Sequence, residues 1–339
     1  MLPQSLFLLD ERSQVGNARR AATELAETLG FDSEQAGRVG LAVTECASNV
    51  LKHAGNGRLL LRALRSDDID GIEIIALDKG PGIADVAASL RDGHSTSGTL
   101  GGGLGALSRM SESFEIFTQP GRGTAVRLEL WAKPLPIRPL HFEVGGVCIP
   151  MHGESVSGDG WAIECWRDQL AVLVADGLGH GIQANEAANA AINTFRQHPK
   201  AEPQQLIEAC HSALARTRGA ALAVARMVIS AGRGSFAGVG NIVCRVEGAQ
   251  AHRNLTSYNG TVGHTLRKVQ EFAFPWPAGA LLVLHSDGLG THWDLSAYPG
   301  LTSRHPALIA AVLYRDYDRG RDDVTVVVIR NRGGSPEAP

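Results

Sequence analysis

The chain has 339 residues, of which 44% are hydrophobic and 20% are charged, and its formal net charge is −3. This near balance gives no electrostatic footprint for nucleic acid or an anionic membrane, and no apolar run approaches the roughly 20 residues that cross a bilayer. A chain of this length exceeds what one hydrophobic core usually serves, so we expect two domains. We also expect a cytoplasmic protein without a secretory leader, because no positive charge precedes the short apolar patch near the start.

The pattern of the first half predicts a mixed α/β domain. Helical spacing of apolar residues predicts helices over 15–29, 33–53 and about 106–111. The strand-like runs are 58–65, 71–78, 113–119 and 124–131. We therefore expect a first domain over residues 1–132.

A proline-rich segment, 133–139, reads as a linker, and the pattern restarts beyond it. The expected strands of the second half are 141–149, 160–167, 170–176, 221–229, 234–239, 280–287 and 324–330. The expected helices are 181–198, 203–217 and 306–316. We expect a second domain over 140–331 and a disordered tail over 332–339.

Aspartates stand at the ends of several strands of the second half. Asp-Gly-Leu-Gly occurs twice, beginning at Asp176 and at Asp287, each time after an apolar run. Asp159 precedes another strand, and Asp322, with Asp323 beside it, precedes the last one. Each motif alone is more often a turn, but together such carboxylates are hard ligands for Mg²⁺ or Mn²⁺. Two such ions can activate water and clamp phosphoryl oxygens during in-line attack.

In this order, the segments GD, DGLGHG, SDGLG and RDDVT resemble the metal-dependent serine/threonine phosphatases of type 2C, in their SpoIIE-like bacterial branch. The resemblance covers about residues 139–330. It implies a β-sandwich flanked by helices, two Mn²⁺ or Mg²⁺ ions, and direct hydrolysis of phosphoserine or phosphothreonine. The metal set that it implies is Asp159, Asp176, the carbonyl of Gly177, Asp287 and Asp322.

Two histidines, His180 and His285, lie next to these aspartates. We expect them to support the site rather than to bind metal, because the carboxylates already form a hard oxygen set. No basic residue matches the one that binds substrate phosphate in eukaryotic relatives, so recognition of the phosphate is unassigned.

Three polar side chains share one face of the second expected helix. Glu45, Asn49 and His53 are spaced i, i+4 and i+8 among apolar neighbours. A buried acid, amide and imidazole in a row are costly unless something polar binds there. From this segment alone, a polar stripe facing solvent is an equal alternative.

Beyond this helix, the strand over 71–78 ends at Asp78, and Gly80 and Gly82 complete D-x-G-x-G. A strand-end carboxylate followed by bare backbone can accept from an exocyclic amine while a flat ring lies over the glycines. A glycine-rich loop then opens a helix, where free N–H groups and the helix dipole favour phosphate. The loop residues are Gly101, Gly102, Gly103, Leu104 and Gly105. This loop is not a P-loop, because no Gly-Lys-Ser/Thr follows.

With Thr124 opening the last strand, these motifs resemble the GHKL ATP-binding fold and, within it, the small anti-sigma-factor serine kinases, including the stressosome switch kinase. The resemblance covers roughly residues 6–131 and implies an α/β sandwich that binds ATP and Mg²⁺. It implies Asn49 on Mg²⁺, Asp78 on the adenine amine, and Glu45 on the accepting serine hydroxyl. His53, Thr124 and the glycines at 80, 82 and 101–105 complete the implied ATP site.

A serine kinase joined to a serine phosphatase indicates a partner-switching regulator. The leading hypothesis is that the chain phosphorylates and dephosphorylates a STAS-type anti-sigma-factor antagonist. In an alternative, the first domain is a non-catalytic ATP-binding or docking module for a sigma factor, a stressosome protein or a STAS protein. A further alternative is that ATP binding gates the phosphatase through the linker. Neither nucleic acid nor membrane is an expected partner, and homodimerisation stays open.

Overall fold

The computed structural model describes residues 4–90, 103–136, 140–248 and 252–333. The chain divides into two compact units. One contains Leu2–Arg138 with Asp294–Arg304, and the other contains Pro139–Trp293 with His305–Pro339. Part of the expected linker, 137–139, and most of the expected tail, 334–339, lie outside the described residues.

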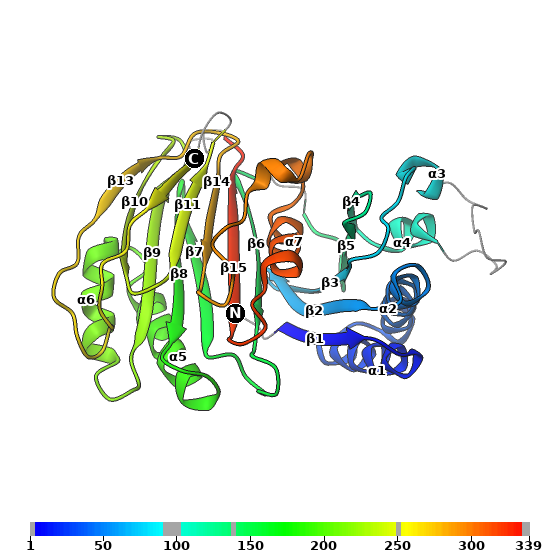
Figure 1. The fold of residues 1–339 in the computed structure, drawn as a ribbon, viewed down its shortest axis with the longest axis horizontal. Helices are drawn as coiled ribbons and strands as arrows, with labels where there is room; N and C mark the ends of the chain where they lie inside the picture. The colour runs from blue at the N-terminus through cyan, green and yellow to red at the C-terminus, as the bar shows by residue number, and fades with distance from the viewer. Residues whose placement is uncertain (1–3, 91–102, 137–139, 249–251, 334–339) are drawn as a thin grey trace. The chain divides into compact units, whose positions relative to one another are not determined.

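In the first unit, helices pack on one face of an antiparallel sheet with the order β1-β2-β3-β5-β4 (Figure 1). The strands are β1 (Gln4–Leu9), β2 (Gly57–Ser66), β3 (Ile69–Asp78), β4 (Ser113–Gln119) and β5 (Gly123–Trp131). The helices are α1 (Arg12–Thr28), α2 (Ser33–Ala54), α3 (Val86–Leu90) and α4 (Leu104–Met110), with short 3₁₀ turns η1 (Leu295–Ala297) and η2 (Leu301–Ser303). The expected α/β sandwich is confirmed.

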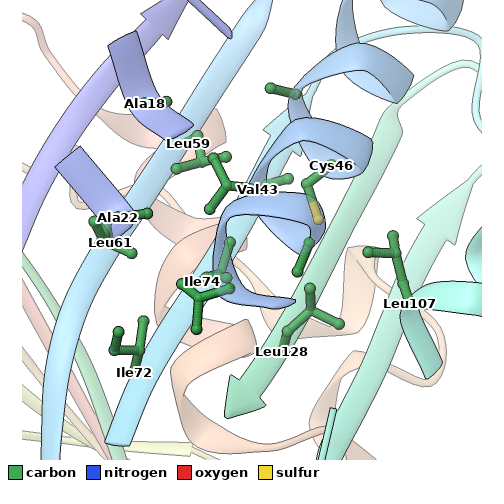
Figure 2. Packing of buried hydrophobic residues seen from close by; sticks show 14 of the residues in the cluster. Ala18, Ala22, Val43, Cys46, Leu59, Leu61, Ile72, Ile74, Leu107 and Leu128 are labelled. Carbon is green, nitrogen blue, oxygen red and sulfur yellow. The ribbon is translucent and has the colours of Figure 1, made fainter. Parts of the chain in front are cut away.

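Alternation along the strands builds the core of this unit. Leu59 and Leu61, two positions apart on β2, face the helices, where Ala22 of α1 and Val43 of α2 meet them (Figure 2). Asp32 fixes where α2 begins, because its side chain accepts the N–H of Gln35 while the Gln35 side chain accepts the Asp32 N–H. This cap fixes the residue at which α2 begins, and so fixes which of its side chains face the sheet.

The second unit is a sandwich of two antiparallel sheets, with the orders β13-β10-β9-β8-β7 and β12-β11-β14-β15-β6 (Figure 1). The first sheet has β7 (Asp159–Trp166), β8 (Gln169–Gly177), β9 (Ala220–Val228), β10 (Arg233–Val239) and β13 (Phe272–Pro275). The second has β6 (Phe142–Ile149), β11 (Val243–Glu247), β12 (His252–Leu255), β14 (Leu281–His285) and β15 (Val324–Asn331). Its helices are α5 (Ile182–Gln197), α6 (Pro203–Ala213) and α7 (Pro306–Tyr317). The expected β-sandwich flanked by helices is confirmed.

The side-chain alternation of β8 decides where its terminal aspartate points. Val172 and Val174 belong to the core between the two sheets, whereas Leu173 and Ala175 pack in the cluster formed with α5 and α6. Asp176 is the next position of the inward series. The strand therefore directs this carboxylate toward the space between the sheets.

Some elements differ from the sequence-based expectation. The patterns do not predict β1, β11, β12 or β13. The C-terminal end predicted for the helix over 203–217 is wrong. α6 stops at Ala213, and beyond it the Thr217 N–H donates to the carbonyl of Leu214 at 2.9 Å and closes a turn. None of the described helices is long and apolar enough to cross a bilayer.

Candidate metal and nucleotide sites

Two of the expected metal ligands face each other across neighbouring strands. Asp159 of β7 and Asp176 of β8 are cross-strand partners at the strand ends. Trp161, two positions from Asp159, lies in the core between the sheets, so Asp159 shares its inward orientation. Asp159 is only 5% exposed.

A serine from the opposite sheet holds Asp159. Ser286, which directly follows β14, donates from its hydroxyl to Asp159 Oδ2 at 2.6 Å. The same hydroxyl oxygen accepts the N–H of Thr325 on β15 at 3.0 Å. The site is thus tied to both sheets of the sandwich. The sequence analysis missed Ser286, although it directly precedes the second Asp-Gly-Leu-Gly.

The carboxylates of this cluster act on one another electrostatically. Burial, followed by repulsion from Asp287 and Asp322, raises the pKa of Asp176 to about 7. Burial, followed by repulsion from Asp176, raises the pKa of Asp159 well above its ordinary value. Buried like charges of this kind are costly unless protons or a cation neutralise them, so the donor set fits a hard divalent cation.

The structure brings the four aspartates within electrostatic reach without forming a closed coordination shell. In the described part of the chain, no group of three or more His, Cys, Asp or Glu side chains is arranged to hold a metal ion. Asn241, which follows β10, donates to Asp287 Oδ2 at 2.6 Å and so orients one of the four carboxylates. Asn241 is a further residue that the sequence analysis missed.

The two adjacent aspartates before β15 have different surroundings. Asp323 is 2% exposed, and its two carboxylate oxygens accept the N–H groups of Met151 at 2.8 Å and Gly158 at 2.9 Å. Asp322 accepts the N–H of Asp323 at 2.9 Å. Asp323 therefore holds neighbouring backbone in place, which supports Asp322 as the metal ligand of the pair.

Close backbone packing explains why glycine follows both strand-end aspartates. A Cβ atom on Gly177 would lie 2.2 Å from the carbonyl oxygen of Ala184. A Cβ atom on Gly288 would lie 2.0 Å from the carbonyl oxygen of Asp323. Neither position can hold a side chain without moving the backbone that it touches.

Hydrogen bonds engage both histidines of the site. His285 is fully buried; its Nε2 accepts from Trp293 Nε1 at 3.0 Å, and its Nδ1 lies 2.8 Å from the carbonyl oxygen of Ser286. Burial lowers the pKa of His285 to about 4, so the ring is neutral. The Nδ1 of His180 lies 2.6 Å from Glu154 Oε1. The supporting roles of the two histidines stay a prediction.

An arginine lies beside the turn that follows Asp176. A Cβ atom built on Gly179 would come within 2.9 Å of Arg218 Nη1. The N–H of Leu178 donates to the carbonyl of Gly219 at 3.0 Å, which joins the two loops. Among the described residues, Arg218 makes no side-chain hydrogen bond or ion pair. Sequence reasoning missed it because its loop is distant along the chain.

In the first unit, α2 carries the expected polar face. Glu45 and Asn49 are half-buried, and His53 is exposed near the end of the helix. Burial and Lys52 lower the pKa of His53, against an opposing effect of Asp78, so the imidazole lies within electrostatic reach of that carboxylate. The end of α2 and the end of β3 therefore lie close together.

Backbone groups fix the carboxylate of Asp78. Its Oδ1 accepts the N–H of Gly80 at 2.8 Å and the N–H of Thr124 at 3.1 Å. A Cβ atom on Gly80 would lie 2.7 Å from the Cβ of Ala54, at the end of α2. Thr124 thus supports Asp78 through its main-chain N–H.

A threonine on β4 completes this network. Thr118 Oγ1 accepts the N–H of Ile83 at 2.9 Å and lies 3.1 Å from Thr124 Oγ1. Gly82 has a φ of +76°, and a Cβ atom there would lie 2.6 Å from the carbonyl oxygen of Gln119. A side chain at Gly82 would therefore collide with this backbone. Nothing in the sequence distinguishes Thr118 from an ordinary strand threonine.

The glycine-rich loop is only partly described. Gly103 is the N-cap residue of α4, and Leu104 and Gly105 are buried in its first turn. Gly101 and Gly102 lie outside the described residues.

Comparison with known families adds to this geometry. Residues 8–130 match the family of the histidine kinase-like ATPase domain (HATPase_c_2), and residues 167–332 match the family of stage II sporulation protein E (SpoIIE). The chain is 34% identical over 116 residues to the serine/threonine-protein kinase RsbT of Bacillus subtilis, which covers 34% of this chain and 87% of RsbT. The first half of the chain belongs to the RsbT family, and the second half matches the SpoIIE family. The domains of the chain are an RsbT-type kinase domain and a SpoIIE-type phosphatase domain, and both family predictions are confirmed.

Further relatives are similar to parts of the chain. The phosphoserine phosphatase RsbX of Bacillus subtilis is 24% identical over 139 residues, which are 40% of this chain and 69% of RsbX. A chain solved in a study of the bacterial stressosome is 27% identical with a TM-score of 0.53, and covers 56% of this chain and 99% of its own length. The PP2C domain of SpoIIE from Bacillus subtilis, solved with a fragment of its regulatory domain, has a TM-score of 0.50 at 17% identity. That match covers 97% of this chain and 100% of the solved one and shows the fold. The domain pair is that of a partner-switching regulator.

Proposed function

We propose that this chain sets the phosphorylation state of a STAS-type anti-sigma-factor antagonist in the cytoplasm. The SpoIIE-type domain removes phosphate from a serine or threonine of that partner, and the RsbT-type domain transfers phosphate to it from ATP. The observation that carries the proposal is the repulsion that Asp287 and Asp322 exert on Asp176, and Asp176 on Asp159, at the strand ends of the sandwich. A stable protein retains such a cluster where cations bind.

In the phosphatase site, Asp159, Asp176, Asp287, Asp322 and the carbonyl of Gly177 would hold two Mn²⁺ or Mg²⁺ ions. Such ions supply Lewis-acid stabilisation of the phosphoryl oxygens and lower the pKa of water. Ser286 and Asn241 orient two of the carboxylates by hydrogen bonds. Arg218 neutralises charge on the substrate phosphate, because its guanidinium lies beside the turn after Asp176 and has no other anionic partner among the described residues.

In the kinase site, Asp78 accepts the adenine amine, and Gly80 and Gly82 lie under the ring. Asn49 would hold Mg²⁺, and Glu45 orients or deprotonates the accepting hydroxyl of the partner. His53, Thr124 and the glycine loop complete the site. ATP with Mg²⁺ supplies the transferable phosphoryl group, and such transfer depends mainly on positioning and charge neutralisation.

The first experiment uses the Asp176→Asn, Asp287→Asn variant, which should be unable to remove the product. This variant is mixed with a candidate STAS-domain protein, Mg²⁺ and γ-labelled ATP, and label on the partner is followed. We expect label to accumulate, and wild-type protein with Mn²⁺ to remove it. If the partner binds and stays unlabelled, the RsbT-type domain is a docking module and only the phosphatase proposal stands.

A further inference from the structure

A cavity of about 340 Å³ opens on the SpoIIE-type domain beside the aspartate cluster. Its lining comes from β11, from β12 and from the turns that follow β10 and β14. The lining residues that matter here are Asn241, Val243, Arg245, Asn254, Leu255 and Trp293. All of them belong to the same compact unit.

Two hydrogen bonds connect this cavity to the metal site. Asn241 lines the cavity and donates to Asp287 Oδ2 at 2.6 Å. Trp293 forms a wall and donates from its indole Nε1 to His285 Nε2 at 3.0 Å. Asn241 thus contacts both the cavity and Asp287. A chain whose phosphate lies at the aspartates could therefore reach the opening within a few residues.

The charge in the cavity is already neutralised. The Cζ atom of Arg245 lies 4.5 Å from the centre of the Trp293 ring, and its Nη1 donates to the Trp293 carbonyl at 3.3 Å. Arg245 Nε also pairs with Glu247 Oε1 at 2.5 Å. Because this cation has its own carboxylate, the cavity does not require an anionic ligand.

The remaining lining mixes apolar walls with uncharged polar groups. Val243, Leu255 and Trp293 supply apolar surface. The amide of Asn254 and the hydroxyl of Thr291 lie on exposed residues at the rim. Apolar surface and polar groups in about equal measure suit a side chain with an apolar body flanked by peptide groups.

We propose that this cavity is a substrate subsite that binds one apolar side chain of the phosphoprotein, within about three residues of the phosphorylated serine. The reach follows from an extended chain, which advances roughly 3.3 Å per residue. The proposal rests on the phosphatase function proposed above. It makes the SpoIIE-type domain selective for the sequence around the phosphate.

The test uses a positional-scanning library of phosphoserine peptides, with p-nitrophenyl phosphate as a substrate too small to fill the cavity. We expect wild-type protein with Mn²⁺ to prefer an apolar residue over Asp or Glu at least tenfold in kcat/KM at one position near the phosphoserine. Equal rates at all positions would overturn the subsite whatever any variant does. Wild-type protein that hydrolyses neither substrate would overturn the phosphatase proposal, and the subsite with it.

A matched pair of variants locates the preference. Asn254→Trp places a large ring at the rim on an exposed position of the edge strand β12. His252→Trp makes the same change at an exposed residue of the same strand that does not line the cavity. We expect Asn254→Trp to lower the ratio of peptide to p-nitrophenyl phosphate kcat/KM at least tenfold and to abolish the apolar preference. His252→Trp should keep the wild-type ratio; the same loss in both variants would overturn the assignment.

Discussion

The hydroxyl of Ser286 donates to the buried carboxylate of Asp159 at 2.6 Å across the two sheets of the SpoIIE-type domain. Ser286 is fully buried and also accepts the Thr325 N–H at 3.0 Å. One side chain therefore joins strands from both sheets at the point where the aspartates meet. The position of Asp159 depends on the alignment of the whole sandwich.

Ser286→Ala removes both of these bonds. A buried N–H and a buried carboxylate each lose a partner, so we expect the protein to lose about 2–3 kcal/mol of unfolding free energy. We also expect Mn²⁺ to bind about tenfold or more weakly, because Asp159 loses the group that orients it. Urea unfolding and calorimetric Mn²⁺ titration measure the two effects. Ser212→Ala, at an exposed position of α6, should change neither; wild-type Mn²⁺ affinity in Ser286→Ala would contradict the positioning role.

The Asp176 carboxyl makes the stability of metal-free protein depend on pH. Its folded pKa is about 7, above the ordinary value near 3.8, so the folded state binds the proton more tightly than the unfolded state. Metal-free protein should therefore lose stability as pH rises from about 4 to about 7 and regain it as pH falls through that window.

Asp176→Asn should weaken this dependence, to which Asp159, whose pKa is also raised, still contributes. We expect the variant to exceed wild type by a few kcal/mol in EDTA at pH 8, since one pKa unit corresponds to about 1.4 kcal/mol. The gain should shrink by pH 5. Chemical unfolding at the two pH values checks this, with Glu186→Gln on the exposed face of α5 as the control. A gain of the same size at both pH values would refute the assignment.

Arg218→Ala tests recognition of the phosphate. We expect KM for a phosphoserine substrate and for p-nitrophenyl phosphate to rise about tenfold, because both carry the dianion that the guanidinium neutralises. Arg218→Lys should recover part of this loss by restoring the charge. Arg216→Ala, at an exposed position two residues away, is the matched control and should behave as wild type. Equal KM values in the two alanine variants would exclude Arg218 from the site.

Alanine variants of Gly82 and Gly121 distinguish the cost of backbone strain from the effect of a side chain that fills the nucleotide loop. Both have positive φ, +76° and +74°, but a Cβ atom meets the Gln119 carbonyl only at Gly82 and nothing within 4 Å at Gly121. Gly121→Ala should cost about 1 kcal/mol and keep ATP binding. Gly82→Ala should destabilise further and lower ATP affinity at least tenfold. Thermal unfolding and titration with a fluorescent ATP analogue decide this, and normal ATP binding by Gly82→Ala would be incompatible with the adenine site.

The cysteines should differ in reactivity toward thiol reagents. Cys165 is exposed, whereas Cys46 and Cys210 are buried, and burial raises the pKa of both thiols to about 12. Burial also raises the pKa of Cys165, to about 11, so few thiolates are present on any of the three near pH 8, and accessibility decides the order of reaction. Cys165 should therefore react first, while the buried pair should stay unmodified. Mass spectrometry of protein labelled with limiting reagent identifies the site. Cys165→Ser should remove the fast phase, and fast labelling of Cys46 in native protein would mean that the α2 core opens.

Three of the four strands missed in the sequence share a physical cause. β1, β12 and β13 are edge strands, as the sheet orders show, whereas β11 lies inside its sheet. An edge strand pairs on one side only and needs less apolar surface, so HRNL in β12 and FAFP in β13 lack an alternating signal. The interior strands β8, β14 and β15 are buried runs of aliphatic residues. The sequence predicts each end of these strands to within two residues.

The motif residues and their order along the chain can be recognised in the sequence, because the local backbone restricts which residue types can stand at these positions. Gly177 and Gly288 follow strand-end aspartates where a side chain would strike neighbouring backbone, and Gly82 needs positive φ. Such constraints act over a few residues and leave a pattern of spacing. The family, the fold of each half and the candidate carboxylates follow from that pattern.

The partners of those residues were decided only by the tertiary structure. Ser286, Asn241, Arg218 and Thr118 reach their sites from strands and loops far along the chain, through hydrogen bonds or close contacts that no local spacing encodes. The different surroundings of Asp322 and Asp323 likewise depend on which backbone N–H groups the folded sandwich brings to each carboxylate. Local sequence determines which groups can do the chemistry, and packing between distant segments determines how they are held.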